Sequence, residues 1–205
     1  MKKPFLLIFF MFFPLSGFGG TKVLLLGDSI TAGYGVEKAQ SYPSLIEKKL
    51  AAAEVGEIEI VNASISGSTS ASALSRLKWY ERIEPDVLFL ALGANDGLRG
   101  LSTEQLHANL SQTIRYALES GMRVILAGMR MPPNYGREYT KSFKNVYKSL
   151  NREYSIVFMP FLLKDVGGRA ELNLPDGIHP NAEGHRRIAE NVLPYILKAH
   201  DTTGR

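Results

Sequence analysis

Short apolar runs alternate with longer amphipathic segments from residue 21 to near the end of the chain. The apolar runs, rich in Val, Ile, Leu and Phe, lie at residues 23–26, 58–61, 87–92, 124–127 and 156–158. They show little alternation between apolar and polar positions, which is typical of strands buried on both faces. The spacing of apolar residues outside these runs predicts helices at residues 42–54, 70–83, 102–120, 139–153 and 184–199.

This alternation of strands and helices predicts an α/β fold, a three-layer α/β/α sandwich around a mostly parallel five-stranded sheet. The sequence contains no linker, internal repeat or low-complexity stretch, so residues 21–205 are expected to form a single domain. In sheets of this kind the functional groups collect at the carboxyl ends of the strands. We therefore expect the chemistry to lie directly after the apolar runs.

The first twenty residues have a different pattern. Lys2 and Lys3 precede an uncharged apolar run at residues 5–15, and small residues follow at positions 16, 17, 19 and 20. This layout is typical of a secretory signal peptide. The run is shorter than the roughly 20 apolar residues needed to span a bilayer, and a buried first helix is the other interpretation. We expect residues 1–20 to be removed, and the protein to be periplasmic or secreted without stable membrane insertion.

Composition and charge exclude several classes of protein. The chain has 205 residues, 45% of them hydrophobic, and no cysteine, which excludes a disulfide scaffold, a zinc ribbon, an iron–sulfur protein and a cysteine nucleophile. The net charge of +4 includes two lysines of the predicted signal peptide; without them 22 basic residues face 20 acidic ones. The remaining basic residues are scattered, so we expect no nucleic-acid partner. We expect a monomer.

Four of the five predicted strands are followed by small and polar residues suited to catalysis. These segments read GDSITAG at 27–33, NASISGST at 62–69, GANDG at 93–97 and DGIHP at 176–180. A histidine can take a proton from a serine hydroxyl, which then attacks a carbonyl carbon. Ser29 and His179 fit these roles, and Asp176 lies three residues before His179, where it can orient the imidazole.

The tetrahedral intermediate of such an attack requires hydrogen-bond donors for its oxyanion. Ser29 begins a helix-entry turn, where backbone N–H groups are unpaired. Gly67 has no side chain to keep a ligand from its own N–H group. Asn95 offers a side-chain amide as a third donor.

Other interpretations of these residues remain open at this level. Each segment alone could form an ordinary turn, and it is their coincidence at four strand ends that favours a site. The phosphate-binding and dinucleotide-binding glycine motifs are absent, and so is the G-x-S-x-G elbow. Metal-assisted hydrolysis is a rival because Asp28, Asn95, Asp96 and His179 are possible ligands, but only one histidine is well placed.

These four segments, in this order, resemble the SGNH (GDSL) hydrolases, in particular their branch of exported bacterial thioesterases, lysophospholipases and arylesterases. The resemblance spans about residues 22–198 and implies a flavodoxin-like sheet with no metal or cofactor. It also implies Ser29 as nucleophile, His179 as base, Asp176 as its partner, and an oxyanion hole formed by the Ser29 and Gly67 amides and the Asn95 side chain. Ala94 departs from the family, whose members often have glycine there.

The resemblance implies a serine esterase or thioesterase acting on a small-molecule or lipid acyl ester, such as a lysophospholipid, an acyl-CoA-like thioester or an aryl ester. Candidate residues for binding the acyl group are Asp28, Leu98, Leu101, Pro132 and Tyr135. A carbohydrate O-acetyl esterase would use the same triad with a smaller pocket. A non-catalytic periplasmic binding module is the alternative from a different class.

Overall fold

The computed structural model describes residues 20–53 and 57–201, so the predicted signal peptide lies, except for Gly20, outside the described residues. Five parallel strands form one sheet in the order β2-β1-β3-β4-β5, the flavodoxin-like order. The strands are β1 (Thr21–Gly27), β2 (Ile58–Asn62), β3 (Val87–Ala91), β4 (Arg123–Ala127) and β5 (Val157–Met159). The predicted parallel α/β sheet is confirmed, with strand bounds within a residue or two of those predicted.

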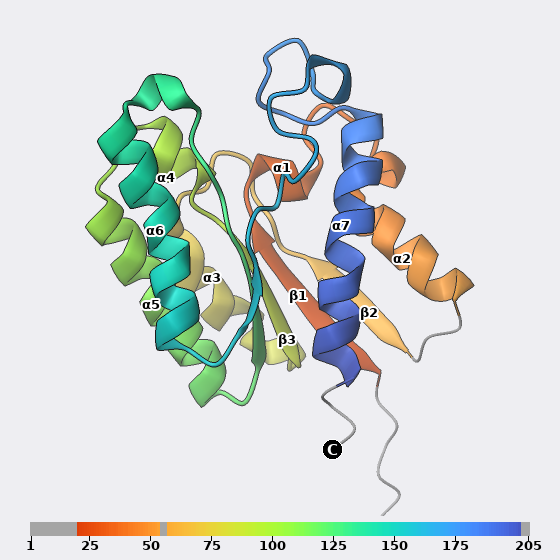
Figure 1. Ribbon diagram of the computed structural model, residues 1–205. Helices are drawn as coiled ribbons and strands as arrows, with labels where there is room; N and C mark the ends of the chain where they lie inside the picture. The colour runs from red at the N-terminus through yellow and green to blue at the C-terminus, as the bar shows by residue number, and fades with distance from the viewer. Residues whose placement is uncertain (1–19, 54–56, 202–205) are drawn as a thin grey trace, which may run out of the picture.

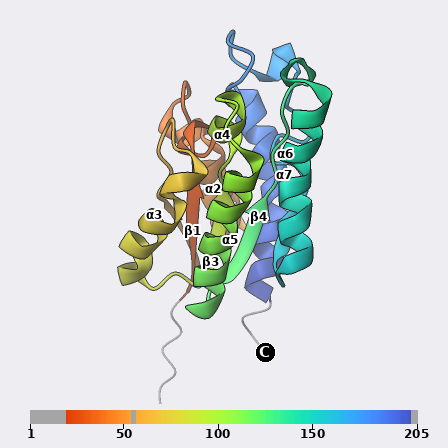
Figure 2. The same cartoon turned by 90° about the vertical axis from the view of Figure 1, so that its left-hand side faces the viewer.

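Helices cover both faces of the sheet (Figure 1). Helices α2 (Tyr42–Ala52) and α7 (Ala182–Asp201) pack together on one face, and α3 (Ala73–Tyr80), α5 (Thr103–Glu119) and α6 (Arg137–Glu153) lie side by side on the other. Figure 2 shows the second layer in front of the strands. Short 3₁₀ turns, Ser70–Ser72 and Glu81–Ile83, flank α3, so the helix predicted at 70–83 consists of three helical pieces.

Two short helices have no counterpart in the sequence pattern. Helix α1 (Ser29–Ala32) follows β1, and α4 (Ala94–Leu98) follows β3. Each is too short to show a helical period of apolar residues, and both lie at the carboxyl edge of the sheet.

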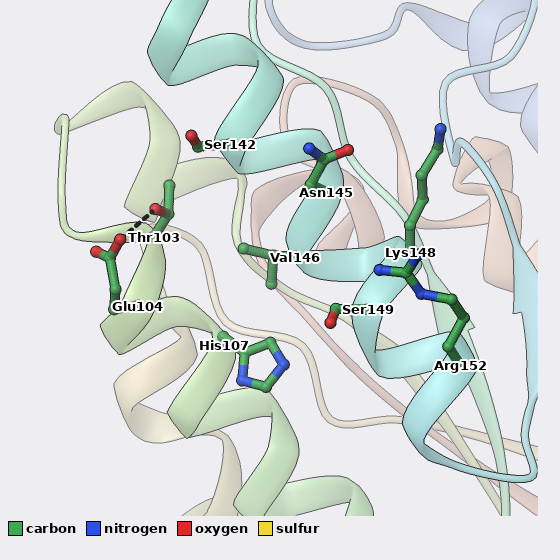
Figure 3. Close-up of a pocket in the computed structure, with 9 residues that line it drawn as sticks. All are labelled: Thr103, Glu104, His107, Ser142, Asn145, Val146, Lys148, Ser149 and Arg152. Atoms are coloured by element: carbon green, nitrogen blue, oxygen red, sulfur yellow. Dashed lines mark hydrogen bonds between the residues drawn. The ribbon is translucent and has the colours of Figure 1, made fainter.

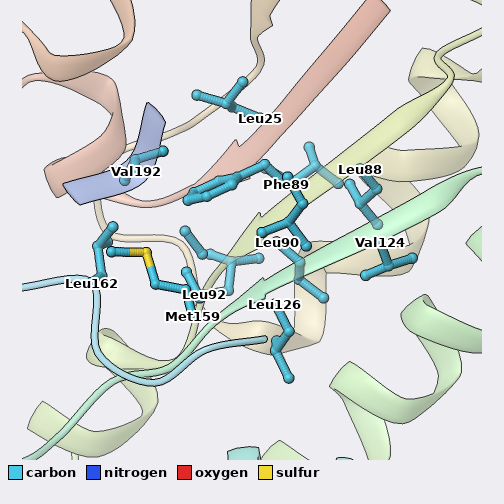
Figure 4. Close-up of a cluster of buried hydrophobic side chains, with 14 of the residues drawn as sticks. Leu25, Leu88, Phe89, Leu90, Leu92, Val124, Leu126, Met159, Leu162 and Val192 are labelled. Carbon is cyan, nitrogen blue, oxygen red and sulfur yellow. The ribbon is translucent and has the colours of Figure 1, made fainter. Parts of the chain in front are cut away.

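The central strands are buried on both faces because helices cover the sheet on each side. All five residues of β3 are buried, with exposures of 2% or less. Phe89 contributes to a core that also contains Leu25, Leu126 and Val192 (Figure 4). Continuous apolar strands of this kind are what a covered parallel sheet requires. Within residues 20–53 and 57–201, no helix has the length and apolar character to cross a membrane.

Strand register brings three connecting loops to one place. Strand β1 lies between β2 and β3, with Leu25 opposite Asn62 and Gly27 opposite Ala91. The chain leaving each of these strands therefore emerges at the same edge. In this strand order the connections diverge to opposite faces beside β1, which leaves a crevice outside the strand ends where ligands bind.

Candidate active site

The turn between β1 and α1 presents Ser29 at the start of a helix. Asp28 is the N-cap residue of α1, and its Oδ1 accepts a hydrogen bond of 3.1 Å from the amide of Ile30. Gly27 has no room for a side chain, because a Cβ atom there would meet the side chain of Thr31. The turn is thus tight, and the Ser29 side chain reaches the edge of the crevice.

Three side chains form a hydrogen-bonded chain. Ser29 Oγ lies 2.9 Å from His179 Nε2, and His179 Nδ1 lies 2.8 Å from Asp176 Oδ2. Asp176 Oδ1 also accepts hydrogen bonds from the amides of His179, at 3.0 Å, and Ile178, at 2.9 Å. Together with the imidazole bond, these two amide bonds lower the pKa of Asp176 to about 2. An ionised Asp176 accepts from Nδ1–H, so Nε2 is left to accept the Ser29 proton.

The loop that carries His179 is fixed by its own backbone. Gly177 has φ +69°, a left-handed conformation that favours glycine, and its amide donates to the carbonyl of Leu174 at 2.9 Å. The amide of Leu174 in turn donates to the carbonyl of His179 at 2.7 Å. Tyr34, which no sequence pattern singled out, lies with its ring centre 4.6 Å from that of His179. The backbone of its own loop and the ring of Tyr34 thus both restrict the position of the imidazole.

The expected oxyanion donors lie on the three segments that follow β1, β2 and β3 at the carboxyl edge of the sheet. Within the part of the chain that the structure describes, the amides of Ser29 and Gly67 donate to no protein acceptor. Gly67 has φ +78°, a left-handed conformation that favours glycine. Asn95 Nδ2 donates one hydrogen to the carbonyl of Ser68 at 3.0 Å, which orients the amide and leaves its second N–H for a ligand. This arrangement can hold a negatively charged oxygen.

Asp28 occupies a different place from the one expected of a residue that binds substrate. Its side chain is 2% exposed, and burial raises its pKa to about 6. The carboxyl group faces the first turn of α1 and lines neither of the cavities described below. Asp28 therefore shapes the nucleophile turn and offers no surface to a substrate.

An apolar cavity of about 300 Å³ opens beside the Ser29 helix. Of the predicted substrate-binding residues, Leu98 and Pro132 line it, whereas Leu101 and Tyr135 do not. The Tyr135 hydroxyl instead donates to the carbonyl of Leu98 at 3.1 Å. Lining residues that sequence reasoning did not identify include Ile30, Phe161, Leu163 and Ile178. Several of these belong to the long irregular segment before α7, which has no periodicity to reveal them.

A larger cavity of about 620 Å³ lies between α5 and α6, away from the strand ends (Figure 3). Its lining is polar, and His107 there pairs with Glu153 at 3.0 Å rather than with a serine. Ser149 likewise donates to Glu153, at 2.7 Å. Neither serine of this lining has a histidine as a hydrogen-bond partner among the described residues, so this cavity has no activated nucleophile.

Metal ligation is the rival chemistry for the strand-end residues. Among residues 20–53 and 57–201, no group of three or more His, Cys, Asp or Glu side chains is arranged to hold a metal ion. Asp96 is instead engaged by Ser70, whose amide and hydroxyl both donate to its carboxylate.

Comparison with known proteins gives a consistent result. The model of the GDSL-like Lipase/Acylhydrolase family matches residues 25–187. Esterase TesA of Pseudomonas aeruginosa is 40% identical over 175 residues, which cover 85% of this chain and 87% of that protein. An arylesterase of Vibrio mimicus is 38% identical, covering 94% and 98%. The thioesterase 1/protease 1/lysophospholipase L1 of Escherichia coli K12 is 33% identical, covering 97% and 94%.

Solved structures agree in fold. The crystal structure of TesA matches with a TM-score of 0.83 at 39% identity, covering 87% of this chain and 99% of that one. The psychrotrophic esterase EstA from Pseudoalteromonas, in a structure inhibited by monoethylphosphonate, matches with a TM-score of 0.82 at 32% identity, covering 87% and 97%. The similarity thus extends through nearly all of the described domain.

Proposed function

This chain belongs to the GDSL-like lipase/acylhydrolase family, and from that premise we propose that it hydrolyses acyl esters through a Ser29–His179–Asp176 triad. The observation that carries the proposal is the continuous hydrogen-bonded chain from Ser29 Oγ through the imidazole to the carboxylate. The amide of Ser29 and that of Gly67, on the neighbouring segment, have no protein partner among the described residues, and an apolar cavity opens beside α1. Relatives named as esterases and a thioesterase support ester hydrolysis and disfavour a non-catalytic binding module.

The first half of the reaction transfers the acyl group to the enzyme. As Ser29 Oγ bonds to the carbonyl carbon, its proton passes to His179 Nε2, and the C=O electron pair moves to the oxygen. The Ser29 and Gly67 amides and the Asn95 side chain then hold the oxyanion. When the intermediate collapses, the bond from carbon to the leaving oxygen or sulfur breaks. His179 gives its proton to the leaving group.

The second half regenerates the serine. Water gives a proton to His179 Nε2 while its oxygen attacks the acyl carbon, and a second oxyanion forms in the same place. Collapse breaks the bond to Ser29 Oγ, which takes the proton back from His179, and a carboxylic acid is released. Asp176 stays ionised throughout and stabilises the imidazolium, because its pKa of about 2 lies far below neutral pH.

The apolar cavity supports an acyl chain longer than acetyl as the preferred substrate group. Its walls, from α1, α4 and the loops after β4 and β5, are mostly aliphatic, aromatic and methionine side chains. A volume of about 300 Å³ is more than an acetyl group occupies. The preferred substrates are therefore fatty acyl esters, as in lysophospholipids, fatty acyl thioesters of the acyl-CoA kind, and aryl esters of similar acids.

A fluorophosphonate probe tests the nucleophile directly. The wild-type protein is expected to be labelled at Ser29, as peptide mapping by mass spectrometry would show, and Ser29→Ala is expected to lose both labelling and ester hydrolysis while its melting temperature is retained. Thr103→Ala, in the polar cavity between α5 and α6, serves as the matched control. Ester hydrolysis that survives in Ser29→Ala would contradict the triad.

A series of p-nitrophenyl esters from acetate to palmitate tests the acyl group. We expect kcat/KM to be highest above acetate, and Leu98→Trp, which fills the cavity, to move the optimum toward acetate. Leu101→Trp is the control, since Leu101 is 42% exposed and lies outside the cavity lining. An optimum at acetate in the wild type would favour the O-acetyl esterase alternative.

We also propose that the protein is exported and that its signal peptide is removed. Residues 1–20 have the layout of a signal peptide, so the working enzyme begins near residue 21 and functions in the periplasm or outside the cell. Intact mass measurement of protein purified from the periplasm of an expressing bacterium tests this, because cleavage removes the first twenty residues. A full-length mass in that fraction would contradict cleavage.

A further inference from the structure

Arg76 on α3 reaches beneath the candidate active site. Its half-buried guanidinium donates to the carbonyl of Gly27 at 3.3 and 3.4 Å, to the hydroxyl of Ser68 at 3.1 Å, and to the carbonyl of Ala63. Two of these acceptors are backbone carbonyls at the ends of adjacent strands, and the third is a side chain on the loop that follows β2. One cation therefore joins the end of β1 to two points on the segment that follows β2.

The acceptors belong to the two segments that present the expected oxyanion amides. Gly27 lies two residues before Ser29, and Ala63 and Ser68 lie on either side of the turn that ends at Gly67. The amides of Ser29 and Gly67 lie on segments that follow different strands, so no covalent turn sets the distance between them. Non-covalent contacts between the two segments must set it.

The chemistry of arginine suits this task. A guanidinium is planar, always charged and carries five donors in a fixed fork, so it can hold several carbonyls at defined positions; an ammonium group is a single point charge. An oxyanion hole needs donors within about 2.7–3.1 Å of the developing charge, so small displacements of one segment weaken it. The opposite side of the Gly67 loop is held by Asn95 and Arg99, which donate to the carbonyls of Ser68 and Gly67. The Gly67 loop is joined to the nucleophile turn by the amide of Ile65, which donates to the carbonyl of Gly27 at 3.2 Å, and by the Arg76 guanidinium, which binds both segments at once.

We propose that Arg76 is a positioning residue of the oxyanion hole, which fixes the Gly67 amide relative to the Ser29 amide. The inference rests on the proposed function, since it assumes that these two amides bind the oxyanion. It requires that loss of Arg76 weakens binding of the tetrahedral intermediate more than binding of the unreacted ester.

The test compares Arg76→Gln with the wild type on two inhibitors of equal alkyl length. A trifluoromethyl ketone accepts Ser29 Oγ at its carbonyl carbon to form a charged tetrahedral adduct, whereas the methyl ketone occupies the cavity without a stable adduct. We expect Arg76→Gln to lower kcat about 10–100-fold at nearly unchanged KM, somewhat less than loss of a whole donor. We also expect it to weaken only the trifluoromethyl ketone, by a similar factor.

Arg82→Gln is the matched control, because Arg82 follows the same helix and stacks on the exposed Trp79 ring at 4.5 Å. It should leave both inhibition constants unchanged. Arg76→Lys keeps the charge but not the fork, so it should show the same selective loss; it also takes the place of Arg76→Gln if that variant does not fold.

An equal loss of affinity for both ketones, or an unchanged kcat in a folded Arg76 variant, would overturn the proposal. Fluorophosphonate labelling of the wild type separates this result from failure of the proposed function. A wild type labelled at Ser29 with a fully active Arg76 variant refutes the positioning role alone. A wild type that resists labelling refutes the triad and the positioning role with it.

Discussion

At the scale of single residues, Asp176 shows how hydrogen bonds can control ionisation at an exposed position. Its side chain is 40% exposed, yet its pKa is lowered to about 2 because two backbone amides and an imidazole donate to it. The carboxylate is therefore ionised at any pH at which the protein is expected to work. Protonation of Asp176 should accordingly contribute nothing to any change of activity between pH 7 and 5.

Asp176→Asn separates the charge of this side chain from its shape. The asparagine oxygen can still accept from the amides of Ile178 and His179, but its NH₂ group then faces Nδ1 and favours the wrong tautomer of the imidazole. We expect kcat to fall by about 10⁴-fold while the melting temperature changes little. Steady-state kinetics with a p-nitrophenyl ester and a thermal melt provide the two measurements. A loss below tenfold would show that Asp176 does not orient the base.

Asn95 gives a second prediction at this scale. Its Nδ2 donates one hydrogen to the carbonyl of Ser68, which leaves the second N–H for the oxyanion. Asn95→Ala removes one of three expected oxyanion donors, so kcat should drop about 10²–10³-fold with KM nearly constant. Asn109→Ala is a suitable control, because Asn109 donates to Ser70 on the far side of the same loop. A change confined to KM would assign Asn95 to ground-state binding instead.

Residue types and their order predict which side chains come together, but not their burial. Ser29, His179 and Asp176 lie within hydrogen-bonding distance as their positions after strands suggest, while their catalytic roles remain predictions. The position of Asp28 directly before Ser29 predicts a substrate contact, yet Asp28 is buried as the cap of α1. A single sequence contains no signal that distinguishes a capping carboxylate from one facing a ligand.

At the scale of elements, the long helices and the strands could be predicted because each has a periodic or continuous apolar pattern. The two helices that matter most for the site could not, since α1 and α4 have four and five residues. Their formation depends on tertiary contacts. Gly93, the N-cap residue of α4, has φ +122° and lies against the hydroxyl of Tyr147 on α6. The position of Asn95 thus depends on a helix in another part of the sequence.

Gly93→Ala tests this dependence. A Cβ atom at residue 93 would collide with the Tyr147 hydroxyl, which donates to the carbonyl of Leu92 at 2.9 Å, and the residue would also be held at an unfavourable φ. We expect a lower melting temperature, a loss of about 2–4 kcal/mol of stability, and a fall in kcat as α4 shifts.

Gly100→Ala is the control for the cost of placing alanine at a positive φ. Gly100 has φ +63°, but a methyl group there would meet no described atom within 4 Å beyond its chain neighbours. The substitution should cost only about 1 kcal/mol and leave kcat unchanged. Adding Tyr147→Phe to Gly93→Ala removes the hydroxyl and should restore part of both losses. Equal effects of the two glycine variants on kcat would show that the contact with α6 does not position α4.

At the scale of the whole molecule, a chain of hydrogen bonds ties α1 to the helix layer behind it, and a buried titratable group lies at each end of this region. His185 on α7 is fully buried, and its Nδ1 accepts from the amide of Tyr42 on α2 at 3.2 Å. The Tyr42 hydroxyl donates to Thr31 on α1 at 2.8 Å. Burial, with a smaller contribution from the charge of His179, lowers the pKa of His185 to about 4. Asp28, at the other end of α1, has its pKa raised to about 6.

These two shifts act on stability in opposite directions over nearly the same pH range. Between pH 6.5 and 4 the unfolded chain protonates His185 more readily than the folded protein does, so acidification removes stability. Between pH 6 and 4 the folded protein protonates Asp28 more readily than the unfolded chain does, so acidification adds stability. Each effect is on the order of 3 kcal/mol over its full range, and the two largely cancel. Asp176 contributes little there, since its pKa is shifted from 3.8 to about 2.

Because the two effects cancel in the wild type, we expect the stability of each single variant to depend on pH more strongly than that of the wild type does. Asp28→Asn keeps a capping oxygen but cannot titrate, so its stability should fall from pH 6.5 to 4 and exceed that of the wild type most clearly at pH 8. His185→Gln keeps an acceptor for the Tyr42 amide, and its stability should rise as the pH falls from 6 to 4. The double variant should again be nearly flat. Urea unfolding midpoints from pH 4 to 8 measure all four proteins. Single variants that follow the wild-type curve would show that folding shifts neither pKa, because only unequal protonation of the folded and unfolded states can produce the opposing slopes.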